Sequence, residues 1–156
     1  PGWMSGFGVI ANYTYIDSEG DLNSNLRPVG VDPTSNAQNA ISNVPLQGLS
    51  KHNYNLVGIY EKDKIAVRFA YNWRSSFVIT TRDVISTFPI ENGSTGQLDA
   101  TAYYNITDKI QFGVEAVNLL NEVTENDTII DDAGTRVTRS WFQNDRRFSF
   151  VLRAQF

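Results

Sequence analysis

The sequence predicts an all-β fold: an antiparallel up-and-down meander of about six long strands, forming a curved segment of a transmembrane β-barrel. Three observations predict it. Apolar and polar residues alternate along most of the chain, and several of these alternating runs are about ten residues long. The connections between them are alternately short and polar, and long. A tilted strand needs about 9–11 residues to cross a bilayer, whereas an ordinary strand has about five or six.

The first two predicted strands, at residues 3–18 and 49–61, alternate less cleanly than the later ones. Their polar sides also hold Ile10, Ile16, Val57 and Ile59. Since successive side chains of a strand point to opposite faces, each strand still has one mainly apolar face. Those faces consist of Phe7, Val9, Ala11, Tyr13 and Tyr15, and of Tyr54, Leu56, Gly58 and Tyr60.

The third predicted strand, at residues 64–79, shows the clearest alternation. One face carries only apolar and aromatic side chains, and the other carries two arginines, a lysine and an asparagine. The apolar face consists of Ile65, Val67, Phe69, Tyr71 and Trp73, opposed by Lys64, Ala66, Arg68, Ala70, Asn72 and Arg74.

The fourth and fifth predicted strands, at residues 96–106 and 109–121, repeat this pattern. Both place charged residues on the side that a soluble sheet would leave wet. Their apolar faces consist of Leu98, Ala100, Ala102, Tyr104 and Ile106, and of Ile110, Phe112, Val114 and Ala116.

The last predicted strand, at residues 140–156, ends the chain on an aromatic residue, Phe156. Phe148, Phe150, Leu152 and Ala154 share its face. In a barrel, aromatic residues gather at the two membrane interfaces. We therefore expect Tyr60, Tyr104 and Phe156 near one interface and Tyr54, Tyr71 and Trp73 near the other.

Two predicted connections are short polar turns, at residues 61–64 and 107–109, of the kind that close hairpins. The other three are long and rich in Asn, Asp, Gly, Ser, Thr and Pro, at residues 19–48, 80–95 and 122–139. Long structureless loops are uncommon in a compact soluble domain, but a transmembrane barrel has short turns on one side and longer loops on the other. Both chain ends then lie on the side of the short turns.

Composition narrows the function classes. The 156 residues are 41% hydrophobic and 12% aromatic, without cysteine, and the mean hydropathy is -0.30. This value excludes a bundle of transmembrane helices but not a barrel, in which only alternate residues are apolar. The net charge of -4 disfavours a nucleic-acid partner. Because the chain starts at Pro1, we expect it to be part of a longer polypeptide.

The residues give no support for an enzyme, and we expect no cofactor. His52 is the single histidine, there is no cysteine, and no Gly-x-Ser-x-Gly elbow occurs. A Ser–His–Asp arrangement stays open from sequence alone. An acidic stretch lacks the order of a calcium loop, so we expect a solvated loop without metal; it comprises Glu122, Glu125, Asp127, Asp131 and Asp132.

Two groups of residues are candidates for contact with a solute. Aromatic residues in the long loops are well placed for capture, because loops present function on a rigid scaffold; these are Phe88, Trp141 and Phe142. Charged residues on the polar face of the strands would line the barrel lumen; these are Arg68, Arg74, Asp99, Glu115, Arg147 and Arg153.

Several segments resemble the late barrel region of TonB-dependent outer-membrane receptors. They are Ser50–Lys62, Val67–Arg74, Val114–Glu122 and the closing segment from Arg146 to Phe156. The resemblance runs from about Phe7 to Phe156. Its most specific parts are the Asn118-Leu119-Leu120-Asn121-Glu122 segment and the strand that ends on Phe156.

The resemblance implies a protein of the cell outer membrane that imports a scarce solute, a siderophore, a cobalamin or a glycan fragment, using TonB-coupled energy. Residues 1–156 would be the C-terminal fragment of its barrel domain. The implied partners are outer-membrane lipid, an N-terminal plug domain and the TonB complex. They also include the barrel assembly machinery, which would read Phe156 as a signal on the last strand.

The sequence departs from the complete family pattern, because no segment could be the plug or the coupling box. Two other classes therefore stay open. One is a passive porin or other outer-membrane barrel, built from the same kind of strands. The other is a soluble β-sandwich binding module, in which the apolar face would pack inward.

Overall fold

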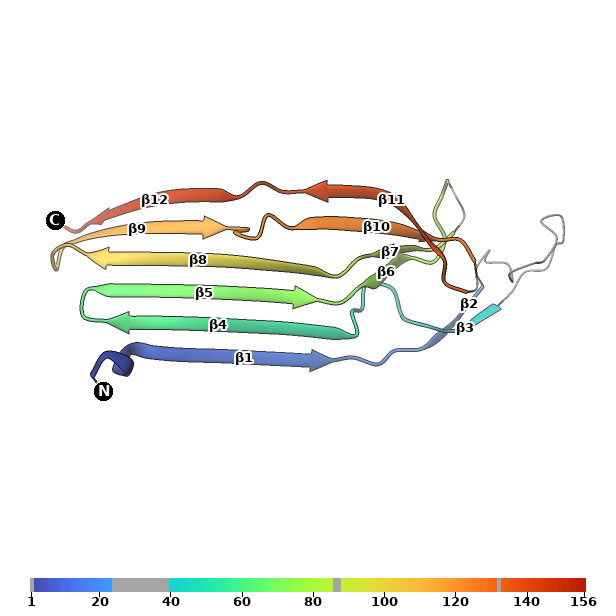
Figure 1. Ribbon diagram of the computed structural model, residues 1–156, viewed down its shortest axis with the longest axis horizontal. Helices are drawn as coiled ribbons and strands as arrows, with labels where there is room; N and C mark the ends of the chain where they lie inside the picture. Colours follow the sequence, from blue (N-terminus) through green and yellow to red (C-terminus); the bar gives the residue numbers. More distant parts are fainter. Residues whose placement is uncertain (1, 24–39, 86–87, 132) are drawn as a thin grey trace.

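The computed structural model describes residues 2–23, 40–85, 88–131 and 133–156. Within these ranges the chain is all-β, apart from a short 3-10 helix, η1 (Gly2–Gly6), and its strands form three antiparallel sheets of six, four and two strands. In Figure 1 the six-stranded sheet occupies one end of the long axis, and the two smaller sheets lie towards the other end.

The six-stranded sheet confirms the predicted antiparallel meander. Each strand pairs with the next of the six along the chain, in the order β1-β4-β5-β8-β9-β12. The sheet is open: β1 and β12 are its edges within the described residues, and no closed barrel is formed. The six strands are β1 (Phe7–Tyr15), β4 (His52–Lys62), β5 (Ile65–Arg74), β8 (Thr95–Asn105), β9 (Ile110–Val117) and β12 (Arg147–Ala154).

The strand register brings the predicted apolar faces onto one side of this sheet. Residues directly opposite each other in an antiparallel pair point to the same face. One row that crosses all six strands is Phe7, Tyr60, Val67, Ala102, Val114 and Phe150. A second row is Val9, Gly58, Phe69, Ala100, Ala116 and Phe148.

This apolar face is exposed. Phe69, Phe112 and Phe150 keep 50%, 40% and 75% of their surface accessible, so no second layer of the described chain packs over them. In the six-stranded sheet, the buried apolar side chains are Val57 and Ala116 alone among the described residues. The sheet is therefore a single layer that lacks a hydrophobic core of its own.

Two tight connections lie at the same end of the sheet as both chain termini (Figure 1). Asp63, between β4 and β5, has a positive φ of 54°, a conformation common in tight hairpin turns. Between β8 and β9, the Thr107 hydroxyl accepts hydrogen bonds from the backbone N–H groups of Lys109 and Ile110, at 3.2 and 3.1 Å. Both predicted short turns are confirmed.

The expectation that the long connections lack structure is wrong for their described parts. Residues 24–39 of the first connection lie outside the described ranges. The four-stranded sheet has the order β11-β10-β7-β6, and a two-stranded sheet joins β2 to β3. Most of these strands are short or lack a regular apolar–polar alternation, so the alternation does not reveal them as separate strands, yet pairing satisfies their backbone groups. They are β2 (Gly20–Asn23), β3 (Ala40–Val44), β6 (Phe77–Thr80), β7 (Ile90–Asn92), β10 (Val123–Ile129) and β11 (Arg136–Gln143).

Four predicted strands are also shorter than expected. The fifth, predicted to reach residue 121, ends at Val117, before the left-handed Asn118. The first begins with η1, where the Ser5 hydroxyl donates to the Gly2 carbonyl oxygen at 2.8 Å. The third stops at Arg74 because Ser75 bonds back to the start of β4: its hydroxyl accepts from the His52 N–H at 3.1 Å. The last is divided into β11 and β12, with residues 144–146 between them.

Candidate ligand groove on the polar face

A groove of ≈ 440 Å³ lies on the polar face, at the end of the six-stranded sheet that adjoins the four-stranded sheet. We call it the amide groove, because most of its polar lining consists of side-chain amides and threonine hydroxyls. The lining comprises Asn12, Thr14, Asn53, Tyr54, Asn55, Asn72, Trp73, Arg74, Thr95, Gly96, Gln97, Asn118, Glu122, Thr124 and Asn144.

Four amides form a straight row across the groove. Asn12 on β1 opposes Asn55 on β4, Asn55 opposes Asn72 on β5, and Asn72 opposes Gln97 on β8. The Asn55 amide donates to the Asn72 side-chain oxygen, and Gln97 donates to the Asp99 carboxylate at 2.9 and 3.1 Å. The next row consists of Thr14, Asn53, Arg74 and Thr95.

The two charged residues of the groove are held by the protein itself. The Arg74 guanidinium donates to the Ser50 hydroxyl at 2.8 Å and lies 3.8 Å from the centre of the Phe77 ring. The Glu122 carboxylate accepts the Gly96 backbone N–H at 3.0 Å. The groove therefore presents mainly uncharged groups that both donate and accept hydrogen bonds.

A turn after β9 closes one end of the groove. Asn118 and Asn121 have left-handed φ angles of 58° and 55°, which asparagine tolerates better than most residues. The Asn118 amide donates to the Asn144 carbonyl oxygen at 2.6 Å, and its side-chain oxygen accepts the Glu122 N–H at 3.0 Å. The Asn118 N–H itself donates to Asp99 at 2.9 Å. The turn thus links β8, β9 and the break between β11 and β12.

The six predicted charged residues share the polar face, because their register partners alternate with the apolar rows. They do not form one cluster. Arg74 and Asp99 hold the ends of the strands near the amide groove, as described above. Among the described residues, Arg68 and Arg147 have no side-chain hydrogen bond or ion pair. These two are the charged groups most available to a solute or to another domain.

Glu115 and Arg153 belong to a separate group near the short turns. Glu115 accepts a hydrogen bond from the Tyr103 hydroxyl, and the Arg153 guanidinium lies 5.2 Å from the centre of the Tyr103 ring. Arg153 also donates to the Gln111 side-chain oxygen at 3.2 Å. The Tyr103 ring lies over Gly113, where an added Cβ would come within 2.4 Å of it.

The three loop aromatics do not converge on one site. Phe88 is half-buried just before β7. Trp141 and Phe142 are neighbours on β11, with 68% and 50% of their surfaces exposed, and so point to opposite faces of that strand. Of the three, Phe142 is the one whose strand partner lines the amide groove, because it lies opposite Thr124 in the β10–β11 pair.

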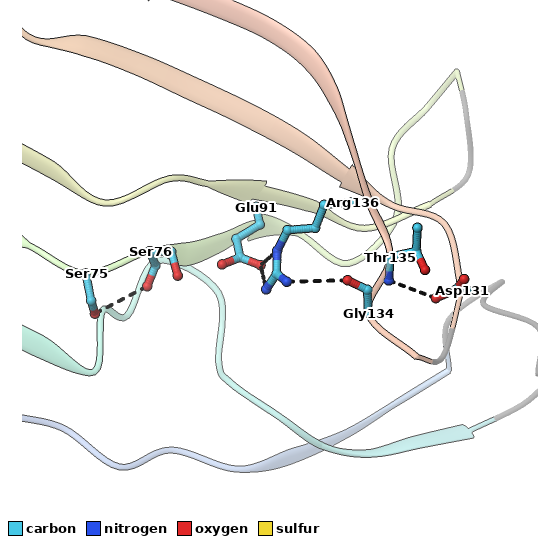
Figure 2. Close-up of polar contacts among 7 residues, drawn as sticks. All are labelled: Ser75, Ser76, Glu91, Asp131, Gly134, Thr135 and Arg136. Atoms are coloured by element: carbon cyan, nitrogen blue, oxygen red, sulfur yellow. Dashed lines mark hydrogen bonds and ion pairs between the residues drawn. The ribbon is translucent and has the colours of Figure 1, made fainter.

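Beyond the amide groove, ion pairs connect β11 to β7 and to Asp83. Figure 2 shows the Arg136 guanidinium in an ion pair with the Glu91 carboxylate on β7, with a shortest distance of 2.9 Å. The guanidinium also donates a hydrogen bond to the Gly134 carbonyl oxygen. In the same view, the Asp131 carboxylate accepts the Thr135 N–H at 2.8 Å. Hydrogen bonds to the Asp131 carboxylate, chiefly those from Thr135, hold the Asp131 pKa below its usual value.

Arg136 and Glu91 also line a second groove of ≈ 560 Å³, together with Lys51, whose ammonium lies 3.1 Å from the Asp17 carboxylate. This second groove carries charges of both signs. A further ion pair joins Arg139 of β11 to the buried Asp83. The four-stranded sheet is therefore fixed by side chains as well as by its backbone ladder.

The acidic stretch does not form a metal site in the described part of the chain, from which Asp132 is excluded. No group of three or more His, Asp or Glu side chains there is arranged to hold an ion. Glu125 and Asp127 lie on β10, and Asp131 caps the turn that follows it. The carboxylates are thus distributed along a strand and a turn rather than converging.

Sequence reasoning missed the amide groove. The sequence shows the four row residues of this groove only as polar positions of separate strands, because their alignment depends on strand register; they are Asn12, Asn55, Asn72 and Gln97. The asparagines at 118 and 121 carried a detectable signal, since Asn at two nearby positions after a strand is typical of left-handed turn residues.

The described residues contain no helix that is long and apolar enough to cross a membrane. Comparisons with protein-family models, with curated proteins and with solved structures found no match to this chain. Function is therefore argued from the sheet and its two faces.

Proposed function

We propose that this chain is the C-terminal part of the barrel of a TonB-dependent outer-membrane receptor, which imports a scarce solute. The observation that carries the proposal is the exposed apolar face that runs without interruption across six long antiparallel strands. Its rows contain Phe69, Phe112 and Phe150, while every charged residue of the central strands β5, β8 and β9 lies on the opposite face. Exposed apolar faces of this extent mark contact with lipid or another protein.

Three further features support a membrane barrel. The strands of the sheet have between 8 and 11 residues, close to the length that a tilted strand needs. Short turns lie at one end of the sheet and long connections at the other (Figure 1). Near the long connections, the Tyr54 ring lies 5.0 Å from Tyr13 and 5.1 Å from Trp73, an arrangement suited to an interfacial aromatic belt.

The open edges of the sheet are consistent with a fragment. Within the described part of the chain, β1 and β12 each have one side without a paired strand, and lipid cannot satisfy the backbone groups of such an edge. In the proposed protein, strands supplied by the rest of the barrel pair with both edges. The family assignment within barrels depends on the sequence resemblance, above all on the 118–122 turn and the terminal strand.

Two measurements test this proposal on the full-length protein. The first is membrane fractionation after expression with a signal sequence in a Gram-negative host. Recovery in the outer membrane supports a barrel, and recovery in the soluble periplasm without detergent would indicate a sandwich instead.

The second measurement separates a receptor from a porin. Solute uptake is compared in cells with and without the TonB complex, and the coding sequence upstream is read for a plug domain. Uptake that depends on TonB supports the receptor. Uptake that is indifferent to TonB, in a protein without a plug, would make it a passive channel.

A further inference from the structure

The amide groove has a regular spacing that a ligand could match. Adjacent strands are about 4.8 Å apart, so the row from Asn12 to Gln97 spans roughly 14 Å. Four amides stand on this line, one for each strand. They offer repeated donors and acceptors along the direction that crosses the strands.

Part of this hydrogen-bonding capacity is unused within the described residues. Asn12 in the amide row, and Thr14 and Thr95 in the adjacent row, have no side-chain hydrogen bond there. Asn12, Asn72 and Gln97 are exposed. Since amides and hydroxyls both donate and accept, the groove is complementary to a ligand whose own groups do the same.

Charge also restricts the ligand. Arg74 and Glu122 are the charged lining residues, and both are occupied by Ser50 and Gly96. Neither residue forms an ion pair among the described residues, but the two charges are opposite in sign, so the lining carries no net charge that would attract an anionic chelate or a cationic ligand. The lining therefore favours an uncharged ligand.

A peptide is a poorer match than a sugar chain. Extended peptides usually bind by adding a strand to a free sheet edge. The groove reaches the edge strand β1 at Asn12 and Thr14, but it extends over β4, β5 and β8, whose backbone groups are paired on both sides. A ligand there meets side chains only. Hydroxyl groups repeated along a chain provide the alternating donors and acceptors that a row of amides can bind.

We propose that the amide groove binds a neutral oligosaccharide through Asn12, Asn55, Asn72 and Gln97. This proposal rests on the proposed uptake function and names the class of its solute. Phe142 does not itself line the groove, but it opposes the groove-lining Thr124, and its exposed ring is a candidate surface for packing against a sugar ring beyond the groove.

The test is calorimetric titration of the purified full-length protein in detergent with neutral hexasaccharides: maltohexaose, cellohexaose, xylohexaose and laminarihexaose. Hexagalacturonate, a ferric catecholate siderophore and an uncharged hexapeptide are the comparison probes. We expect at least one neutral hexasaccharide to bind. We also expect N55A/N72A to weaken that binding about tenfold or more, because two hydrogen-bonding positions are lost.

The matched control is Asn105→Ala, which removes an amide from the same face of β8 but near the short turns, where Asn105 accepts from Gln111 at 2.8 Å. Its binding should equal that of the unmodified protein, and all variants should reach the outer membrane in equal amounts. The proposal is overturned if none of the four neutral hexasaccharides binds, if the siderophore or the peptide binds in their place, or if N55A/N72A binds normally. Failure of the uptake function would appear separately, as absence from the outer membrane or as TonB-independent passage.

Discussion

The Asn118 side-chain amide donates a hydrogen bond of 2.6 Å to the carbonyl oxygen of Asn144, 26 residues further along the chain. Asn118 directly follows β9, and Asn144 lies in the break between β11 and β12. This contact lies where the six-stranded sheet ends and the four-stranded sheet begins. Together with the Glu122 N–H that its side-chain oxygen accepts at 3.0 Å, this contact gives Asn118 a structural role in the turn at residues 118–122.

Replacement of Asn118 by glycine should destabilise the protein by about 1–3 kcal/mol, because it removes hydrogen bonds to partly buried backbone groups while keeping the left-handed φ available. The matched control is Asn121→Gly, a site with a similar φ of 55° whose side chain makes no hydrogen bond within the described residues. Unfolding of both variants in denaturant gives the comparison. Equal costs would mean that conformation, not the Asn118 contacts, fixes this turn.

Phe69→Arg should cost about 2–4 kcal/mol of unfolding free energy if Phe69 lies near the bilayer midplane. Phe69 is central in β5 and belongs to the apolar face. Arg68→Ala is the control, since Arg68 is adjacent but on the polar face and has no side-chain partner in the described chain. Unfolding from lipid vesicles should show a much smaller loss for Arg68→Ala, and similar losses would contradict the assignment of the two faces.

Gly113→Ala should destabilise the sheet by about 1–3 kcal/mol through overpacking. The new Cβ would come within 2.4 Å of the Tyr103 ring, so the ring must move and its hydroxyl must leave Glu115. Gly58→Ala, on β4 of the same sheet, places a Cβ that meets nothing within 4 Å and should be neutral or slightly stabilising. Thermal unfolding of the two variants checks this difference.

Deletion of Phe156 should lower the amount of full-length protein in the outer membrane without changing its synthesis. Phe156 follows β12 and is fully exposed. This is expected if the barrel assembly machinery binds the last strand by strand addition and recognises its terminal aromatic residue. Quantitative immunoblots of membrane and whole-cell fractions measure the two quantities. Phe156→Tyr, which keeps the ring, should assemble normally, and unchanged assembly of the deletion would remove Phe156 from this role.

The turn between β10 and β11 should loosen at acidic pH. Hydrogen bonds from Thr135 lower the Asp131 pKa in the folded state, so this contribution is complete above the unfolded-state pKa of about 4. It is lost as the pH falls through the lower, folded pKa. Asp131→Asn, which cannot ionise, provides the reference: the difference in amide exchange between the two proteins at residues 133–136 should disappear in acid. A difference that persists in acid would mean that ionised Asp131 does not stabilise the turn.

The predicted meander succeeded because its signal is local. A side-chain period of two assigns each residue of β5, β8 and β9 to a face before any partner strand is known. The same reasoning found Arg68, Arg74, Asp99 and Glu115 on one face. It failed for β10 and for the first half of β11, whose mixed residues have no clear period although the two strands pair with each other along nearly their whole lengths.

By itself, the sequence determined the number of long strands, the side of each that is apolar, and the positions of the two tight turns, because those properties depend on neighbouring residues. The tertiary structure decided which residues stand opposite one another. The row from Asn12 to Gln97, the clamp of Asn118 on Asn144 and the pairing of Arg136 with Glu91 join segments that lie far apart in the chain. Register sets these contacts, and register is fixed only when all the strands have paired.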